Sequence, residues 1–261
     1  MTKLLFACDI DNTLIYSHRH PHDDWECVEW IHQEQSYMSP ETKRGLLRLP
    51  FWLKPVPVTS RTIGQYLRLK MPMPFDLALT ANGADLLVEG RPDVAWRAET
   101  DVLIAPWREE LQRCIKLLEG TEGFLNVAVA DNAYLYAVCS DVPEASQRAR
   151  ALESITKMEV IASGRKLYML PPPLNKGRAV IRLKEKVGFS RVIAAGDSPM
   201  DLPMLYGADA AVVPHTLRMM VPGHAFVCPE GRLFSEYVME TVHQIIENPD
   251  RFRYCDKSSC E

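Results

Sequence analysis

Two aspartates, Asp9 and Asp11, stand two residues apart directly after the short apolar run of residues 3–8. In extended backbone, residues two apart point to the same side, so both carboxylates would face the crevice in which open α/β sheets bind ligands. Two carboxylates placed together repel each other unless a cation neutralises them. We therefore expect a hard divalent metal ion here, and Mg²⁺ is the natural choice for phosphate chemistry.

Two other interpretations of this segment are a calcium-binding loop and a solvated acidic loop. A calcium loop needs an acid or Asn at its fifth position, Gly at its sixth and Glu at its twelfth. This chain has Thr13, Leu14 and His20 at those positions, so the calcium interpretation fails. A solvated acidic loop stays open for this motif taken alone.

Thr59 and Ser60 follow a second apolar run, residues 56–58, and precede a stretch that favours a helix. Their hydroxyl and backbone N–H groups would meet at the N-terminus of that helix, which is a ready site for an anion. Arg61 follows them directly. Taken alone, a Thr-Ser pair before a helix is more often a simple cap, and that interpretation also stays open.

A lysine and two further aspartates occupy comparable positions later in the chain. Lys176 begins a predicted helix, where the positive end of the helix dipole disfavours a cation unless a negative group lies nearby. Asp197 and Asp201 follow the apolar run of residues 192–195, so they again place carboxylates at the carboxyl end of a strand. An exposed lysine, and a turn with a helix cap, are the plain alternatives.

Strand and helix patterns alternate in both terminal parts of the chain, which is typical of a doubly wound, mostly parallel α/β sheet. We expect strands at 3–8, 56–58, 75–79, 191–195, 210–213 and 225–227. Helices are expected between them, at 39–49, 62–69, 175–187, 200–206 and 232–247. The polar stretch 17–38 is predicted to be a loop or small hairpin, and the tail from 248 to 261 to lie at the surface.

The middle of the chain follows a different pattern, one helix and two strands, which occurs twice. After a hairpin expected over 84–98, helices are predicted at 101–118 and 141–155, and strands at 124–130, 134–139, 157–162 and 165–170. This pattern predicts a small inserted α+β domain, residues 99–170, with two helices on one face of an antiparallel sheet. The core domain is then formed by residues 1–98 and 171–261, and Pro171–Pro173 would be a stiff joint between the two.

The four motifs together resemble those of the haloacid dehalogenase (HAD) superfamily of aspartate-nucleophile phosphatases. In chain order they are Asp9–Thr13, Thr59–Arg61, Lys176 and Gly196–Asp201. The resemblance covers the whole expected core. The inserted segment looks like the type IIB cap of Cof-type, sucrose-phosphate and mannosyl-3-phosphoglycerate phosphatases, and the turn Thr80–Ala84 is similar to one usual in that branch.

The resemblance implies a catalytic role for four residues. Asp9 would be the nucleophile that takes the phosphoryl group, and Asp11 the general acid that protonates the leaving alkoxide and then activates water. Thr59 would bind a phosphoryl oxygen. Lys176 would offset the negative charge of the nucleophile and the phosphate. These roles agree with the chemistry of the residues, because a carboxylate nucleophile splits hydrolysis into two displacements.

The resemblance also implies a metal site and substrate contacts. Mg²⁺ would be held by Asp9, the backbone carbonyl of Asp11 and Asp197, with Asp201 as an outer partner. Substrate contacts are expected from Ser60, Arg61 and Asn82. The cap would recognise the leaving group, although Arg165 and Lys166, at its last turn, are more simply interpreted as solvated.

The chain departs from the family pattern in places. Asn12 stands where this branch usually has Gly, and Met200 replaces a common Asn, so one hydrogen bond to that loop would be missing. Thr13 is expected to hold its loop through its hydroxyl group. His18, His20 and His22 could suggest a second metal, but an alternating His run in a loop more often binds nothing.

The composition is that of an ordinary globular protein. The 261 residues are 47% hydrophobic, with 30 basic and 34 acidic side chains and a net charge of −4, and the sequence pI is near 6.0. This balance gives no reason to expect nucleic acid or a membrane as a partner. Seven scattered cysteines with no CxxC pair argue against disulfides and a zinc ribbon. We expect a cytoplasmic protein, a monomer or small homo-oligomer.

The leading hypothesis is therefore a Mg²⁺-dependent phosphomonoesterase acting on a small phosphorylated metabolite, a sugar phosphate by resemblance. A phosphomutase of the phosphomannomutase type is the first alternative, but it calls for several basic cap side chains around a bisphosphate. A catalytically silent binding module on the same fold is the second alternative. A binding module has no need for the second carboxylate at Asp11.

Overall fold

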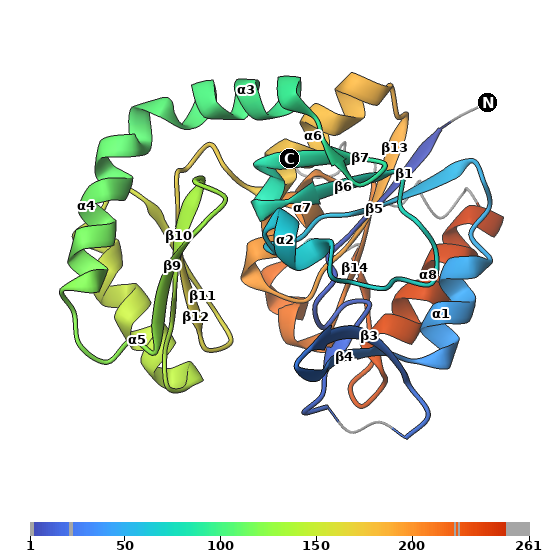
Figure 1. The fold of residues 1–261 in the computed structure, drawn as a ribbon. Helices are drawn as coiled ribbons and strands as arrows, with labels where there is room; N and C mark the ends of the chain where they lie inside the picture. Colours follow the sequence, from blue (N-terminus) through green and yellow to red (C-terminus); the bar gives the residue numbers. More distant parts are fainter. Residues whose placement is uncertain (1–2, 21–22, 222, 224, 249–261) are drawn as a thin grey trace.

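The computed structural model of the chain describes residues 3–20, 23–221, 223 and 225–248. Its central sheet has five parallel strands in the order β15(Phe226–Val227), β14(Ala210–Val213), β13(Arg191–Ala195), β1(Leu4–Cys8) and β5(Leu53–Pro57) (Figure 1). The predicted doubly wound α/β core is therefore confirmed.

Strand β1, which lies between β13 and β5, is apolar throughout, as expected of a strand covered on both faces. Leu4, Phe6 and Cys8 pack in one core cluster with α1(Pro40–Leu47) and α8(Phe234–Glu247). Leu5 and Ala7 point to the opposite face, where α6(Lys176–Val187) and α7(Leu202–Gly207) cover the sheet. The core thus has helices on both faces, and the carboxyl ends of β1 and β13 meet at one edge.

Two small antiparallel sheets extend this core. One consists of β6(Leu77–Thr80), β7(Asp85–Val88) and β8(Arg91–Pro92). The other consists of β2(Tyr16–Ser17), β4(Gln33–Met38) and β3(Glu26–Ile31), so the polar stretch predicted as a loop or small hairpin contains a hairpin. Of the tail, only residue 248 lies within the described residues.

A four-stranded antiparallel sheet forms the second part of the molecule, at the left of Figure 1. Its strands run in the order β11(Glu159–Ser163), β12(Lys166–Leu170), β10(Tyr134–Val138) and β9(Asn126–Ala130). One face packs against α4(Arg108–Glu119) and α5(Val142–Glu153). The other face carries Tyr134 and Tyr168, which pack against Met200 of the core. The predicted sheet with two helices on one face is confirmed.

The structure differs from three expectations about individual elements. The hairpin expected over 84–98 ends at Pro92, and α3(Val94–Ile104) follows, with a break at Ala105–Trp107 before α4. Asp93 caps α3 by accepting a hydrogen bond from Trp96 N, and Pro106 lacks the N–H that a continuous helix needs.

The other two differences concern the bounds of one strand and the pairing of another. The strand expected at 56–58 is present, but its bounds are Leu53–Pro57, where two prolines are tolerated because β5 is an edge strand. The strand expected at 75–79 pairs with β7 instead of joining the central sheet. An isolated parallel bridge between Val58 and Leu79 joins it to the chain that follows β5.

No helix within the described ranges combines the length with the apolar character that crossing a membrane requires. The five cysteines found in those ranges, Cys8, Cys27, Cys114, Cys139 and Cys228, carry free thiols, as expected.

The turn at Asn82–Gly83 sets the distance between the small β6–β7 sheet and α6. Gly83 has φ +88°, and a Cβ atom there would lie 2.1 Å from the Cβ of Ala179 on α6. Its carbonyl accepts a hydrogen bond from the indole N–H of Trp96, 3.0 Å away, and Trp96 is fully buried. Only glycine combines this backbone conformation with so close an approach.

We predict that Gly83→Ala lowers the free energy of unfolding by about 1–3 kcal/mol or more, because it strains the backbone and overpacks α6. Gly64→Ala is the matched control, since a Cβ at Gly64 meets nothing within 4 Å. The control is expected to be neutral or slightly stabilising. Urea unfolding followed by circular dichroism measures both; equal stability of the two variants would contradict the prediction.

Candidate active site

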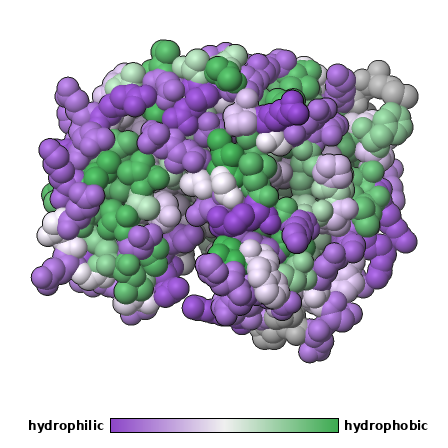
Figure 2. Space-filling view, viewed as in Figure 1, coloured by the Kyte–Doolittle hydropathy of each residue, from purple (hydrophilic) through white to green (hydrophobic). Residues whose placement is uncertain are grey.

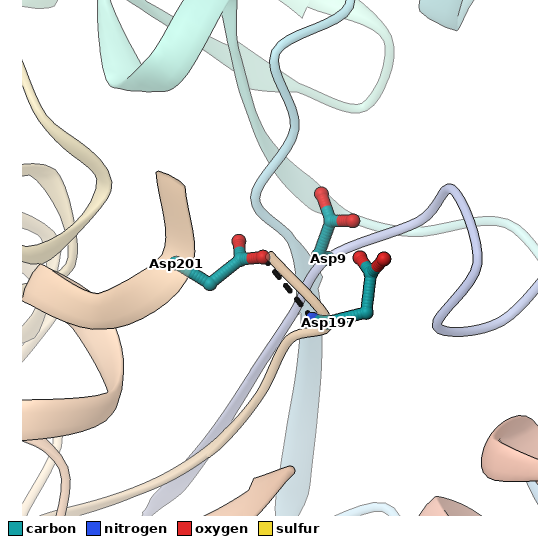
Figure 3. Close-up of side chains that lie close together, drawn as sticks. All are labelled: Asp9, Asp197 and Asp201. Carbon is teal, nitrogen blue, oxygen red and sulfur yellow. Dashed lines mark hydrogen bonds between the residues drawn. The ribbon is translucent and has the colours of Figure 1, made fainter. Parts of the chain in front are cut away.

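The carboxyl ends of β1 and β13 bring two aspartates side by side. Cys8 is paired with Ala195 in the parallel register, and Asp9 N donates to Ala195 O, 2.9 Å away. Asp9 follows β1 directly, and Asp197 lies two residues beyond β13. Oxygen atoms of Asp9, Asp197 and Asp201 all lie within 4.8 Å of one another, and Figure 3 shows the three side chains converging.

Lys176 enters this group from the first turn of α6. Its Nζ donates to Asp9 Oδ1 at 2.5 Å and to Asp201 Oδ1 at 2.6 Å, and the side chain is only 2% exposed. Burial alone would lower the pKa of Lys176, but Asp201 and Asp9 raise it above its ordinary value. Lys176 therefore remains a buried ammonium ion, and the interpretation as an exposed lysine is wrong.

Asp201 is fully enclosed and uses both carboxylate oxygens. While Oδ1 accepts from Lys176, Oδ2 accepts from Asp197 N, Ser198 N and Ser198 Oγ at 2.9–3.2 Å (Figure 3). A Cβ atom at Gly196 would lie 2.4 Å from Asp201 Cβ, so glycine is required for this approach. Asp201 thus fixes both the loop that presents Asp197 and the position of Lys176.

The donor set of this cluster fits a hard divalent cation. Three carboxylates face one ammonium group, and carboxylate oxygens are the ligands that Mg²⁺ takes in proteins. Burial and the nearby Asp201 raise the pKa of Asp197 to about 7. Burial and neighbouring carboxylates also raise the pKa of Asp9, against the opposing effect of Lys176. A bound cation would remove this excess of negative charge.

The loop after β1 is held in a conformation that its sequence allows. Asn12 has φ 57°, a region that Asn tolerates better than most residues, which explains how it stands where the family resemblance leads us to expect Gly. Thr13 Oγ1 donates to Asp197 Oδ1 at 3.3 Å, as expected of a residue that holds the loop. Met200 packs against the antiparallel sheet, and Asp201 bonds its own loop without the missing Asn.

Asp11 is paired with Arg61. The guanidinium donates from Nε and Nη2 to the two oxygens of Asp11 at 2.8 and 2.7 Å, and from Nη1 and Nη2 to Glu29 at 2.8 and 2.9 Å. Partial burial would raise the pKa of Asp11, but Arg61 lowers it below the ordinary value. Arg61, expected to contact substrate, is thus shared between two carboxylates.

Glu29 comes from the β3–β4 hairpin and was not expected in the site. A β-bulge interrupts the pairing on both sides of Glu29, and the side chain is 4% exposed. Ser36 Oγ donates to Glu29 Oε2 at 2.8 Å. The alternation of the strand alone would not place Val28 and Glu29 both inside, so Glu29 could not be identified from the sequence pattern.

A cavity of about 620 Å³ adjoins the cluster. Its lining includes six of the nine residues to which the sequence analysis gave a catalytic, metal-binding or substrate-binding role: Asp9, Asp11, Ser60, Arg61, Lys176 and Asp197. Thr59 and Asn82 are buried and are not among its lining residues. Thr59 Oγ1 accepts from Arg61 N at 3.1 Å, and Asn82 N donates to Thr59 O, so both shape the segment that carries Ser60 and Arg61.

The antiparallel sheet contacts that same segment. Tyr134 Oη donates to Ser60 O at 2.6 Å, and Asp131 Oδ2 accepts from Ile63 N at 2.8 Å. Tyr168 lines the cavity beside Ser60. The sheet is therefore fastened over the site by hydrogen bonds to residues 60–63.

The histidine-rich stretch forms no metal site among the described residues, where the cluster of metal-binding side chains is the one at Asp9. His20 packs against the rings of Tyr16 and Trp25, while His18 lines the cavity. His22 lies outside the described residues.

Comparison with family models and with curated proteins gives no match. Among solved structures, the chain is similar to the sucrose-phosphatase from Synechocystis sp. PCC6803, with a TM-score of 0.63 and 17% identity over 94% of this chain and 98% of that one. It is also similar to a trehalose-6-phosphate phosphatase related protein, with a TM-score of 0.55, 13% identity and coverage of 94% and 99%.

A further similar structure is the HAD-superfamily phosphatase BT1666 from Bacteroides thetaiotaomicron, with a TM-score of 0.54 and 14% identity over 94% of this chain and 95% of that one. In each case the likeness extends over almost the whole of both chains. The chain therefore has the fold of the HAD-superfamily phosphatases, a doubly wound core with an additional α+β part.

Proposed function

We propose that this protein is a Mg²⁺-dependent phosphomonoesterase that hydrolyses a small sugar phosphate through an aspartyl-phosphate on Asp9. The observation that carries the proposal is the buried contact of Lys176 with Asp9 and Asp201, beside Asp197 and at the wall of a 620 Å³ cavity. Burying an ammonium ion among three carboxylates costs free energy. The transfer of a phosphoryl dianion would explain this cost, because the reaction needs a positive charge beside the nucleophile.

In the proposed reaction, Asp9 attacks the phosphorus and the bond to the leaving oxygen breaks. Asp11 gives its proton to that oxygen, then takes one from the water that attacks the phosphorus and releases Asp9. Asp9, Asp197 and the backbone carbonyl of Asp11 would hold Mg²⁺, with Asp201 behind them. When bound, the ion neutralises charge on the transferred phosphoryl group.

The ion pair between Arg61 and Asp11 bears on the protonation of Asp11 that this mechanism requires. Asp11 can act as an acid only when it carries a proton, and Arg61 stabilises its ionised form. Glu29 competes for the same guanidinium, so it weakens the hold of Arg61 on Asp11. We infer that substrate binding draws Arg61 toward Glu29 and lets Asp11 take up a proton.

Two further considerations support the proposed substrate and setting. The similar Synechocystis sucrose-phosphatase was solved in complex with sucrose and phosphate. The free thiols of the described cysteines suit a reducing compartment, in line with a cytoplasmic location.

The proposal keeps the expected division into a core, residues 1–98 and 171–261, and a cap, residues 99–170. Trp96 packs in a core cluster, whereas Ile104 packs with Tyr134 and Tyr168 of the antiparallel sheet. The first crossing between the two parts would then lie within α3, and the second at Pro171–Pro173.

We predict that Asp9→Asn lowers phosphate release from p-nitrophenyl phosphate in Mg²⁺ by at least about a thousandfold, because the amide cannot act as the nucleophile. Asp76→Asn, which alters an exposed carboxylate paired with Lys54, is the control and is expected to keep full activity. Chelation of the metal should abolish wild-type turnover, and Mg²⁺ should restore it. Unchanged turnover by Asp9→Asn would remove Asp9 from the nucleophile role.

Replacing Lys176 by Met should leave Asp9 and Asp201 as buried carboxylates without their partner. Without metal, the expected loss in free energy of unfolding is about 3–5 kcal/mol, measured by urea unfolding. Mg²⁺ should recover part of this loss, since it neutralises the same carboxylates. Lys184→Met, on the same helix with a partly exposed side chain, is the control and should change stability little. An equal loss with and without Mg²⁺ would contradict the proposed metal site.

Glu29→Gln tests whether Glu29 helps Asp11 to take up the proton that it donates. Without Glu29, Arg61 would pair with Asp11 alone, so the acid step would slow by about 10- to 100-fold for an alkyl phosphate, whose leaving group needs a proton. Hydrolysis of p-nitrophenyl phosphate, whose leaving group is stable as an anion, should change much less. Glu26→Gln, an exposed change on the same strand, is the control. Equal slowing of both substrates would exclude this role for Glu29.

A further inference from the structure

The cavity beside Asp9 continues past Asp11 into a second one of about 200 Å³. The two share Asp11, Glu29, Ser60, Arg61, Lys166 and Tyr168 in their linings. Figure 2 shows a group of hydrophilic residues, with hydrophobic ones next to it, at the junction between the antiparallel sheet and the core. A phosphate ester with its phosphorus at Asp9 would extend its leaving group past Asp11 into this second cavity.

One wall of the second cavity is the face of the antiparallel sheet that points toward the core. Tyr136 and Tyr168 are paired across β10 and β12, with ring centroids 6.4 Å apart. Lys166, two residues before Tyr168 on the same face, places its ammonium group 5.9 Å from the Tyr136 ring. Arg68, beyond the short helix α2(Ile63–Tyr66), approaches from the core side.

Some cations of the site are bound by carboxylates of the protein, whereas others are available to bind an anionic ligand. Lys176 and Arg61 are each held by two carboxylates at hydrogen-bond distance. Lys166 has no ion pair with any residue that the structure describes, and it is exposed to the cavity. Arg68 is 42% exposed and lies 3.6 Å from Glu29, which already binds Arg61 in a closer contact. The other two cations, Arg19 and Arg165, line only the cavity beside Asp9. The second cavity therefore holds available positive charge from Lys166 and Arg68.

The charge balance of the whole site supports the same conclusion. Six cationic side chains line the two cavities, whereas four anionic ones line them and a fifth, Asp201, contacts Lys176. A phosphate dianion and a divalent cation would cancel each other. An excess of positive charge would remain. The second cavity shares in it, because three cations, Arg61, Arg68 and Lys166, line this cavity against two carboxylates, Asp11 and Glu29.

We infer that the leaving group of the substrate carries a second anionic group, a carboxylate or a second phosphate, bound by Lys166 and Arg68. This rests on the proposed phosphatase function and narrows its substrate to acidic sugar phosphates. Tyr136 supplies an aromatic surface beside the anion. Lys166, interpreted from the sequence as a solvated turn residue, becomes a determinant of specificity.

The test compares matched esters that differ in one charged group. We expect kcat/KM for 6-phosphogluconate to exceed that for sorbitol 6-phosphate by at least about tenfold, since hydrogen bonds to charged groups contribute about 1.5–3 kcal/mol. Fructose 1,6-bisphosphate against fructose 6-phosphate tests the second phosphate in the same way. The pair of esters with the larger ratio of kcat/KM values, acidic to neutral, identifies the second anionic group as a carboxylate or a phosphate.

Lys166→Met keeps the length of the side chain and removes its charge, so the preferred ratio should fall toward one. Lys157→Met, an exposed lysine that lines neither cavity, is the control and should keep the ratio. Ratios near one for the wild type in both arms, or an unchanged ratio in Lys166→Met, would overturn the inference while leaving the phosphatase function intact.

Binding measured by calorimetry separates this inference from the chemistry. Asp9→Asn with Mg²⁺ should bind the acidic ester of the preferred pair at least about tenfold more tightly than its neutral partner, and Lys166→Met in that background should remove the difference. Selective binding without turnover of any ester by the wild type would keep the anion site and overturn the phosphatase function. Equal binding of acidic and neutral esters would overturn the anion site itself.

Discussion

The site depends on keeping one ammonium ion charged where water does not reach it. Lys176 is 2% exposed and retains its proton because Asp9 and Asp201 both accept from it. Removing Lys176 would leave two buried carboxylates without their partner, so the three groups form a unit. Such a unit adds little to stability compared with apolar packing. Its value lies in fixing where Asp9 points.

The fold provides this unit through backbone pairing. The register of β1 with β13 places Asp9 next to Ala195, and the turn at Gly196 then allows Asp201 to approach within a distance that a side chain would block. The contact of Gly83 with Ala179 sets α6, and hence Lys176, at its distance from the sheet. Gly196 and Gly83 therefore determine the positions of Asp201 and Lys176, although neither glycine has a side chain that could take part in the chemistry.

The four motifs and the parallel core were predictable because they depend on local pattern: an apolar strand followed by a carboxylate, or a helix start with a lysine. Glu29 was not predictable, because a bulge turns it inward against the alternation of its strand. Lys166 looked like any turn lysine, since only the packing of the two sheets forms a cavity around it. The start of α3 was missed although Trp96, Thr100 and Ile104 are buried at intervals of four residues.

The hydrogen bonds from Tyr134 to Ser60 and from Asp131 to Ile63 join the antiparallel sheet to the segment that also carries Thr59 and Arg61. A ligand too large to enter with these bonds intact must break them, and doing so releases the backbone that carries Arg61, the partner of Asp11. For the phosphatase proposed above, the passage of substrate and product would then be coupled to the contact between Arg61 and Asp11. Its turnover would depend on the hydrogen bond from Tyr134 to the Ser60 carbonyl as well as on the chemistry at phosphorus.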